Sequence, residues 1–182
     1  MLSSPRRLAL SILTLAGALA AAHCQRDADA PAATADSGCC EVTPNSALGA
    51  GVGRIVVSYP GGDGAGSTRL DVYAAGTSKA IESKYGDAAL ELAPGTYDVT
   101  VGGRRVAGVG VQAAHDTRIR VGVLYVHATD GTRIDLVEPA DGAKLASGYG
   151  EKQYGLPVGL VGVEVAGQRD TALIEDGKVT EF

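Results

Sequence analysis

Large aromatic side chains and helical periodicity are what this sequence lacks. Its 182 residues include no tryptophan, one phenylalanine and one methionine, but 26 glycines. Any hydrophobic core must therefore be built from valine, leucine, isoleucine, alanine and the seven tyrosines. Valine-rich segments interrupted by glycines are typical of short strands joined by turns. The composition thus predicts an all-β protein.

Sequence motifs of catalysis and cofactor binding are also missing. There is no Gly-x-Ser-x-Gly nucleophile motif in the chain. Residues 61–68 have the glycine spacing of a phosphate-binding loop, but they lack its lysine and precede a strand-like segment where the motif needs a helix. We therefore predict that the chain is not an enzyme, has no catalytic residues and binds no cofactor.

The cysteines and histidines do not form a metal-binding pattern. Zinc ligands usually occur in closely spaced pairs on both sides of the site, whereas Cys39 and Cys40 stand far from His115 and His127. We predict no metal site. Cys39 and Cys40 are neighbours that could form a strained, reducible disulfide, or could tie the N-terminal segment onto the folded part.

Acidic residues outnumber basic ones, 21 to 16, so the net charge is −5. The basic residues are scattered, and Arg104 and Arg105 are the only adjacent pair after the first 23 residues. This balance argues against nucleic acid or an anionic lipid surface as the main partner.

The N-terminus has the pattern of a secretory signal peptide. Arg6 and Arg7 precede an uncharged run over residues 8–22, which is shorter than the roughly 20 apolar residues of a membrane-spanning helix. We therefore predict a signal peptide over residues 1–23 and export of the rest.

Two routes of processing stay open. Cleavage after the alanines of residues 20–22 would release a soluble secreted protein, whereas lipidation of Cys24 would give a periplasmic or outer-membrane lipoprotein. Lipidation would leave an even number of cysteines, and residues 24–52, rich in alanine, aspartate and proline, are predicted to be a flexible linker. His23 departs from the usual residue before a lipidated cysteine.

An internal repeat organises the remainder of the chain. Residues 67–105 align without a gap with residues 131–169, at an offset of 64 positions. The identical pairs include Arg69 with Arg133, Tyr85 with Tyr149, and Gly103 with Gly167. The repeat predicts one module over residues 53–122 and a second over residues 123–182, with no linker between them.

Each copy has the alternation of half-buried antiparallel strands. In residues 96–101, Tyr97, Val99 and Val101 would face a core while Thr96, Asp98 and Thr100 face solvent. The expected fold is two tandem small antiparallel β-sandwich modules, preceded by the signal peptide and linker. Two independent modules and one pseudo-symmetric sandwich are both compatible with this pattern.

Residues 92–101, LAPGTYDVTV, fit the pattern L-x-P-G-x-Y-x-V-x-V, and residues 156–167 vary it. This signature resembles prealbumin-like modules, that is, the carboxypeptidase regulatory-like and PEGA-type domains of bacterial envelope proteins. Such tandem modules also occur C-terminal to von Willebrand factor A domains. The resemblance covers residues 53–182 and implies a non-catalytic β-sandwich; it assigns no functional residue.

Tyr85 and Tyr149 occupy the same place in the two copies, each followed by glycine and an acid. They would either contact a partner or cap the end of a core, with the glycine at positive φ. We expect an exported, membrane-tethered adaptor that binds an envelope protein or polysaccharide. A structural spacer and an accessory subunit of a secreted hydrolase are the alternatives.

Overall fold

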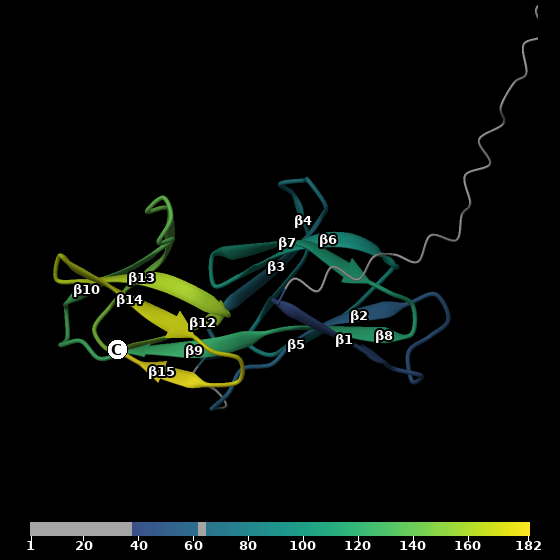
Figure 1. Cartoon of the computed structure of the whole chain (residues 1–182), viewed down its shortest axis with the longest axis horizontal. Coiled ribbons are helices and arrows are strands. Elements are labelled where there is room, and N and C mark those ends of the chain that lie inside the picture. The colour runs from purple at the N-terminus through teal and green to yellow at the C-terminus, as the bar shows by residue number, and fades with distance from the viewer. Residues whose placement is uncertain (1–37, 62–64) are drawn as a thin grey trace, which may run out of the picture. The chain divides into compact units, whose positions relative to one another are not determined.

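Short strands joined by tight turns make up residues 38–61 and 65–182, which are the residues that the computed structural model describes (Figure 1). The predicted signal peptide of residues 1–23 and Cys24 lie outside these residues. The strands are β1 (Cys40–Pro44), β2 (Gly53–Val57), β3 (Arg69–Ala74), β4 (Ala80–Tyr85), β5 (Ala88–Leu92), β6 (Gly95–Val101), β7 (Arg104–Val111), β8 (His115–Ile119), β9 (Val121–Val126), β10 (Arg133–Val137), β11 (Lys144–Tyr149), β12 (Lys152–Pro157), β13 (Gly159–Val165), β14 (Gln168–Ile174) and β15 (Val179–Glu181).

These strands form four sheets, each named after one of its inner strands. The β2 sheet has the order β1-β8-β2-β5 and the β3 sheet has β4-β3-β6-β7. The β9 sheet has the order β12-β9-β15 and the β10 sheet has β11-β10-β13-β14. Adding seven to the number of each strand in the β3 sheet gives the strand order of the β10 sheet. The sequence repeat therefore has a counterpart in the strand topology.

The prediction of an all-β chain is confirmed, but the prediction of two tandem antiparallel β-sandwich modules is wrong. The described strands form four small sheets in a propeller-like arrangement of four blades. Two sheets also contain a parallel pair, β2 with β8 and β9 with β15. In each parallel pair the last strand of a copy lies beside its first, a long-range pairing that local alternation does not encode.

Strand β9 connects the two halves of the chain, residues 53–122 and 123–182, without a linker. Successive side chains of a strand point to opposite faces. Val121 and Val123 accordingly pack in one core with Ile55 and Leu70, whereas Leu124 and Val126 pack in a second core. The described residues fall in one compact unit.

Part of the predicted linker is structured. Residues 40–44 form β1, which pairs antiparallel with β8, and Cys40 lies opposite Ile119. The side chains of β1 are mostly exposed, so this strand is held mainly through its backbone pairing. No helix in residues 38–61 and 65–182 is long and apolar enough to span a membrane.

Asp98 on β6 is buried, contrary to the expectation that it faces solvent. Its carboxylate accepts hydrogen bonds from Arg105 Nη2 at 2.7 Å and from the backbone N–H groups of Gly76 at 3.1 Å and Gly108 at 2.9 Å. These groups cover the outer face of the β3 sheet, at an irregularity in the β6–β7 pairing. The hydrogen bond from Arg105 and then those from the backbone lower the pKa of Asp98 from 3.8 to about 2.

Acid should therefore weaken the fold through Asp98. Because its pKa is lowered by folding, the carboxylate stabilises the folded state above about pH 4, and this contribution is lost as the pH falls toward 2. We expect the Asp98→Asn variant to be less stable at neutral pH and to lose less stability over that range. Urea unfolding from pH 7 to 2 measures this, with Asp170→Asn as the control. Parallel pH profiles for wild type and Asp98→Asn would contradict the assignment.

Candidate functional site

The two tyrosines singled out by the repeat are exposed at equivalent places. Tyr85 ends β4 with 62% of its surface exposed, and Tyr149 ends β11 with 61% exposed. Each lies opposite an arginine on the neighbouring strand, Tyr85 beside Arg69 and Tyr149 beside Arg133. Neither tyrosine therefore caps a core, which leaves both rings open to contact from outside.

An acid holds each of these arginines in place. Arg69 Nε donates to Asp71 at 2.9 Å, and Arg133 Nε donates to Asp135 at 2.8 Å. The hydrogen bond to the acid raises the pKa of each arginine, so both guanidinium groups stay charged. Each half thus presents one tyrosine beside an ion-paired arginine, and in the second half Asp135 also pairs with Lys144. These two sets, Tyr85-Arg69-Asp71 and Tyr149-Arg133-Asp135, are called the tyrosine patches.

The glycine after each tyrosine fixes the turn that exposes the ring. Gly86 and Gly150 have φ of 66° and 67°, as expected from the sequence, and glycine adopts this region without strain. Their N–H groups donate to the carbonyls of Thr68 and Thr132, both at 2.9 Å. The same backbone contact therefore positions the tyrosine in both halves.

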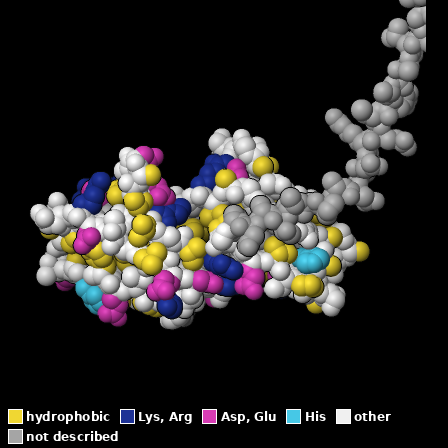
Figure 2. Space-filling model, viewed as in Figure 1, with side chains coloured by type: hydrophobic (Ala, Val, Ile, Leu, Met, Phe, Trp, Pro, Cys, Tyr) yellow, Lys and Arg dark blue, Asp and Glu magenta, His cyan; other side chains and the backbone are white. Residues whose placement is uncertain are grey.

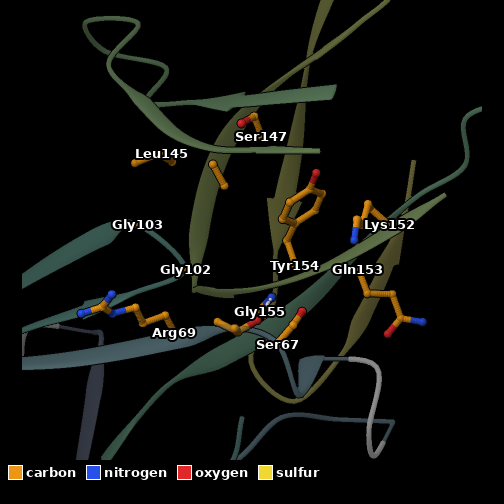
Figure 3. Close-up of a pocket in the computed structure, with 12 residues that line it drawn as sticks. Ser67, Arg69, Gly102, Gly103, Leu145, Ser147, Lys152, Gln153, Tyr154 and Gly155 are labelled. Carbon is orange, nitrogen blue, oxygen red and sulfur yellow. Dashed lines mark hydrogen bonds between the residues drawn. The ribbon is translucent and has the colours of Figure 1, made fainter. Parts of the chain in front are cut away.

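A pocket of about 310 Å³ lies where the two halves meet (Figure 3). It is called the seam pocket. Its lining comes from the start of β3, the β6–β7 turn, β11 and β12, namely Ser67, Thr68, Arg69, Gly102, Gly103, Leu145, Ala146, Ser147, Lys152, Gln153, Tyr154 and Gly155. Both halves contribute to the pocket, so it exists only while they stay packed together.

Close backbone contact forms the floor of the seam pocket. The N–H of Gly155 donates to Thr68 Oγ1 at 2.9 Å, and this bond is buried. A Cβ on Gly155 would lie 2.8 Å from that oxygen and from Cζ of Tyr59. Glycine is therefore required at position 155 for the two halves to approach each other.

The hydroxyl of Tyr154 is buried and has no hydrogen-bond partner among the described residues. It lies above Gly148, as does the aliphatic part of Lys152. Burial raises the pKa of Tyr154, so this hydroxyl keeps its proton. Figure 3 shows the tyrosine hydroxyl directed toward the strand of Ser147, while the guanidinium of Arg69 points away from it.

The remaining predicted site residues lie elsewhere. The Sγ atoms of Cys39 and Cys40 are 3.0 Å apart, within hydrogen-bond distance, and burial raises the pKa of the Cys40 thiol to about 12. A Cys39–Cys40 disulfide stays a prediction. Among the residues that the structure describes, no three His, Cys, Asp or Glu side chains are placed to hold a metal ion.

Sequence reasoning missed the seam pocket. Lys152, Tyr154 and Gly155 match no motif, Thr68 is only the last residue of the glycine-rich segment 61–68, and the residues around the pocket are far apart in the chain. One signal was present, because the repeat places Tyr154 opposite Leu90 and Lys152 opposite Ala88. The second copy carries polar residues at positions where the first is apolar.

Comparison with known proteins does not assign a family. No model of a known protein family matches the chain, and no curated protein is significantly similar to it. Among solved structures, the Bacillus anthracis TIE protein is similar at 14% identity and a TM-score of 0.32, over 71% of this chain and 33% of that one. A leucine-rich repeat protein from Bacteroides thetaiotaomicron is similar at 12% identity and a TM-score of 0.24, over 72% of this chain and 26% of that one.

The chain thus spans about a third or less of the solved structures that it matches. The four-sheet arrangement differs from a prealbumin-like sandwich. The resemblance to prealbumin-like and carboxypeptidase regulatory-like modules is therefore wrong. Its motif, residues 92–101, describes a strand and turn that occur in many β-proteins.

Proposed function

We propose that this protein is a non-catalytic binding module that is exported to the cell envelope and contacts a polysaccharide or an envelope protein through its tyrosine patches. The observation that carries the proposal is the repetition of the patch. Tyr85 and Tyr149 are both more than half exposed, at positions related by the repeat, and each lies beside an ion-paired arginine. The fold itself does not require an exposed ring there.

The chemistry of the patches suits a ligand with apolar faces and polar edges. An exposed tyrosine offers a flat apolar surface with a hydroxyl, and the neighbouring arginine and aspartate offer hydrogen-bond donors and acceptors. Two equivalent patches on one chain favour a partner with repeating units, because a second contact then forms at high effective concentration. A polysaccharide has such repeats, which makes it the favoured partner.

Charge is mixed on the face shown in Figure 2, where lysine and arginine side chains lie beside aspartate and glutamate side chains. Binding there would depend on local groups more than on a broad electrostatic field. This supports a contact centred on the tyrosines rather than on a charged patch.

Removing both tyrosines should abolish most of the binding. We expect Tyr85→Ala and Tyr149→Ala each to weaken binding about tenfold, and the double variant to weaken it more than either, since exposed aromatic anchors often dominate an interface. Co-sedimentation with isolated cell-wall polysaccharide, and with the envelope protein fraction, measures it. Ile81→Ala, an exposed apolar side chain on β4, is the control.

The pattern of results separates the alternatives. If the tyrosine variants lose binding to the polysaccharide, the result supports polysaccharide as the partner. If they lose binding only to the protein fraction, the partner is a protein. A spacer predicts that wild type and the double variant behave alike with both fractions, and that outcome would refute the proposal.

A further inference from the structure

We infer that the seam pocket is a second binding site, which takes one acidic sugar unit of an oligosaccharide and holds its carboxylate with Lys152. The seam pocket shares Arg69 with the patch of Tyr85, but the inference does not depend on Tyr85 or Tyr149. Lys152, Tyr154, Ser67 and Ser147 carry it.

The repeat itself shows that the polar groups of the pocket are not needed by the fold. Tyr154 on β12 corresponds to Leu90 on β5, which is buried in the first core without any hydroxyl to satisfy. A buried hydroxyl without a hydrogen-bond partner destabilises the folded state. Tyr154 bears such a hydroxyl at the pocket, although leucine serves at the equivalent place. The Tyr154 ring lines the pocket, and a small rotation of this side chain would bring its buried hydroxyl to a ligand hydroxyl that supplies the missing hydrogen bond.

Lys152 supplies positive charge to the pocket. It corresponds to Ala88 in the first copy, and it forms no ion pair with any residue that the structure describes. No aspartate or glutamate lines the seam pocket. Arg69, its other cationic residue, is paired with Asp71 and directed away from Tyr154 (Figure 3). One available ammonium group fits one carboxylate, and a phosphate-binding site would commonly hold more cations.

Hydroxyl groups line the rest of the pocket. Ser67, Ser147 and Tyr154 can each donate and accept a hydrogen bond, which is the property needed to bind sugar hydroxyls. The volume, about 310 Å³, is at the lower end of the range for small-molecule sites, which suits a single sugar ring.

A second hollow adjoins the pocket and indicates a longer ligand. It measures about 270 Å³ and shares Ser67, Lys152 and Gln153 with the seam pocket, while Tyr125 and Glu151 complete its lining. A hydrogen bond from Tyr125, followed by one from His127, lowers the pKa of Glu151. Glu151 is therefore ionised at neutral pH and repels a second carboxylate. The sugar unit in this second hollow should therefore be neutral, so the fitting ligand carries a neutral sugar beside the acidic one.

The test uses an oligosaccharide of alternating glucuronate and N-acetylglucosamine, and the same oligosaccharide with its carboxylates reduced to alcohols. Titration calorimetry on the exported chain should show binding of the acidic form, at least tenfold tighter than that of the reduced form. The Lys152→Gln variant should bind the acidic oligosaccharide at least tenfold more weakly than wild type does. It should bind the acidic and the reduced oligosaccharides with equal affinity. Tyr154→Phe should bind several-fold more weakly while unfolding at the same urea concentration or higher.

Matched variants make the outcome decisive. Lys84→Gln, an exposed lysine on β4, should leave affinity unchanged, and the Tyr85→Ala, Tyr149→Ala double variant should still bind the oligosaccharide. The experiment can therefore refute the proposal for the tyrosine patches without refuting the proposal for the seam pocket, and the reverse. Equal affinity for acidic and reduced forms, unchanged affinity in Lys152→Gln, or no binding at millimolar ligand would each overturn the inference.

Discussion

Replacing Gly103 with alanine should lower the free energy of unfolding by about 3 kcal/mol or more, whereas the same change at Gly167 should cost about 1 kcal/mol. The two glycines are equivalent in the repeat and both have positive φ, 89° and 81°. Alanine at either position pays the same backbone strain. Only the surroundings of the two residues differ.

The surroundings of Gly103 are the other half of the chain. A Cβ there would meet the carbonyl oxygen of Leu145 on β11 and would lie 2.8 Å from its carbonyl carbon, whereas a Cβ on Gly167 would meet nothing within 4 Å. Backbone cannot move aside as a flexible side chain does, so the β3 and β10 sheets would have to separate. The loss of stability in Gly167→Ala measures the backbone strain alone. Subtracting it from the loss in Gly103→Ala leaves the cost of disturbing the contact between the halves.

Urea unfolding of both variants gives the two free energies. A larger loss at Gly103 with a single transition would support a fixed contact between the halves, as expected from the absence of a linker in the sequence. Equal losses would mean that the contact between Gly103 and Leu145 yields at little cost, and the seam pocket would then lack a firm wall.

The sequence predicted strands better than it predicted their partners. The offset of 64 residues places β3 to β7 onto β10 to β14, and both sets are strands. Alternation within a strand says which residues share a face, but it does not say that Arg54 to Val56 pair in parallel with Asp116 to Arg118. That pairing joins segments about 60 residues apart and depends on the whole chain.

Two local errors have physical reasons. The side chains of residues 40–44 are mostly exposed, and Val42 is their one aliphatic side chain, so β1 has little hydrophobic signal and the sequence predicts a linker there. Asp98 fits the polar side of an alternating strand, yet Arg105 and two glycine N–H groups cover it. In both cases hydrogen bonds that alternation does not report decide the outcome.

The sequence indicates one of the two candidate sites, and only the structure reveals the other. Tyr85 and Tyr149 could be selected from the sequence because the repeat marks them, although only the structure shows that both are exposed. The seam pocket could not be selected in this way, since Ser67 joins Ser147 and Lys152 only when the halves pack. What the sequence did contain was the departure from the repeat at Tyr154 and Lys152.

The second large effect is expected at Arg104, which joins the halves by charge. Its Nε and Nη2 atoms donate to Glu138 at 2.6 and 3.0 Å, and Nη2 also donates to the carbonyl of Leu160 at 2.5 Å. Only 11% of the arginine side chain is exposed. Breaking a fully buried pair costs about 3 to 5 kcal/mol. Because Glu138 is partly exposed, we expect Arg104→Ala to cost about 2 to 3 kcal/mol.

A double-mutant cycle isolates the pair. Arg104→Ala and Glu138→Gln, alone and together, should give a coupling energy of about 1 to 2 kcal/mol in urea unfolding. Arg169→Ala is the control, because it removes an ion pair with Glu164 that lies within one half. The Arg169 side chain is 54% exposed, so this variant should lose about 0.5 kcal/mol of stability or less. Equal losses at Arg104 and Arg169 would contradict a stabilising role at the seam.

The shape of the Arg104→Ala transition carries further information. The repeat places Gln168 at the position of Arg104, so the ion pair is not part of the repeated unit and serves only the contact between the halves. If this contact couples their unfolding, weakening it should separate one cooperative transition into two, with the less stable half melting first. Because β9 contributes side chains to both cores, we expect the transition to broaden before it divides. A sharp single transition that merely shifts to lower urea would show that β9 couples the two cores without Arg104.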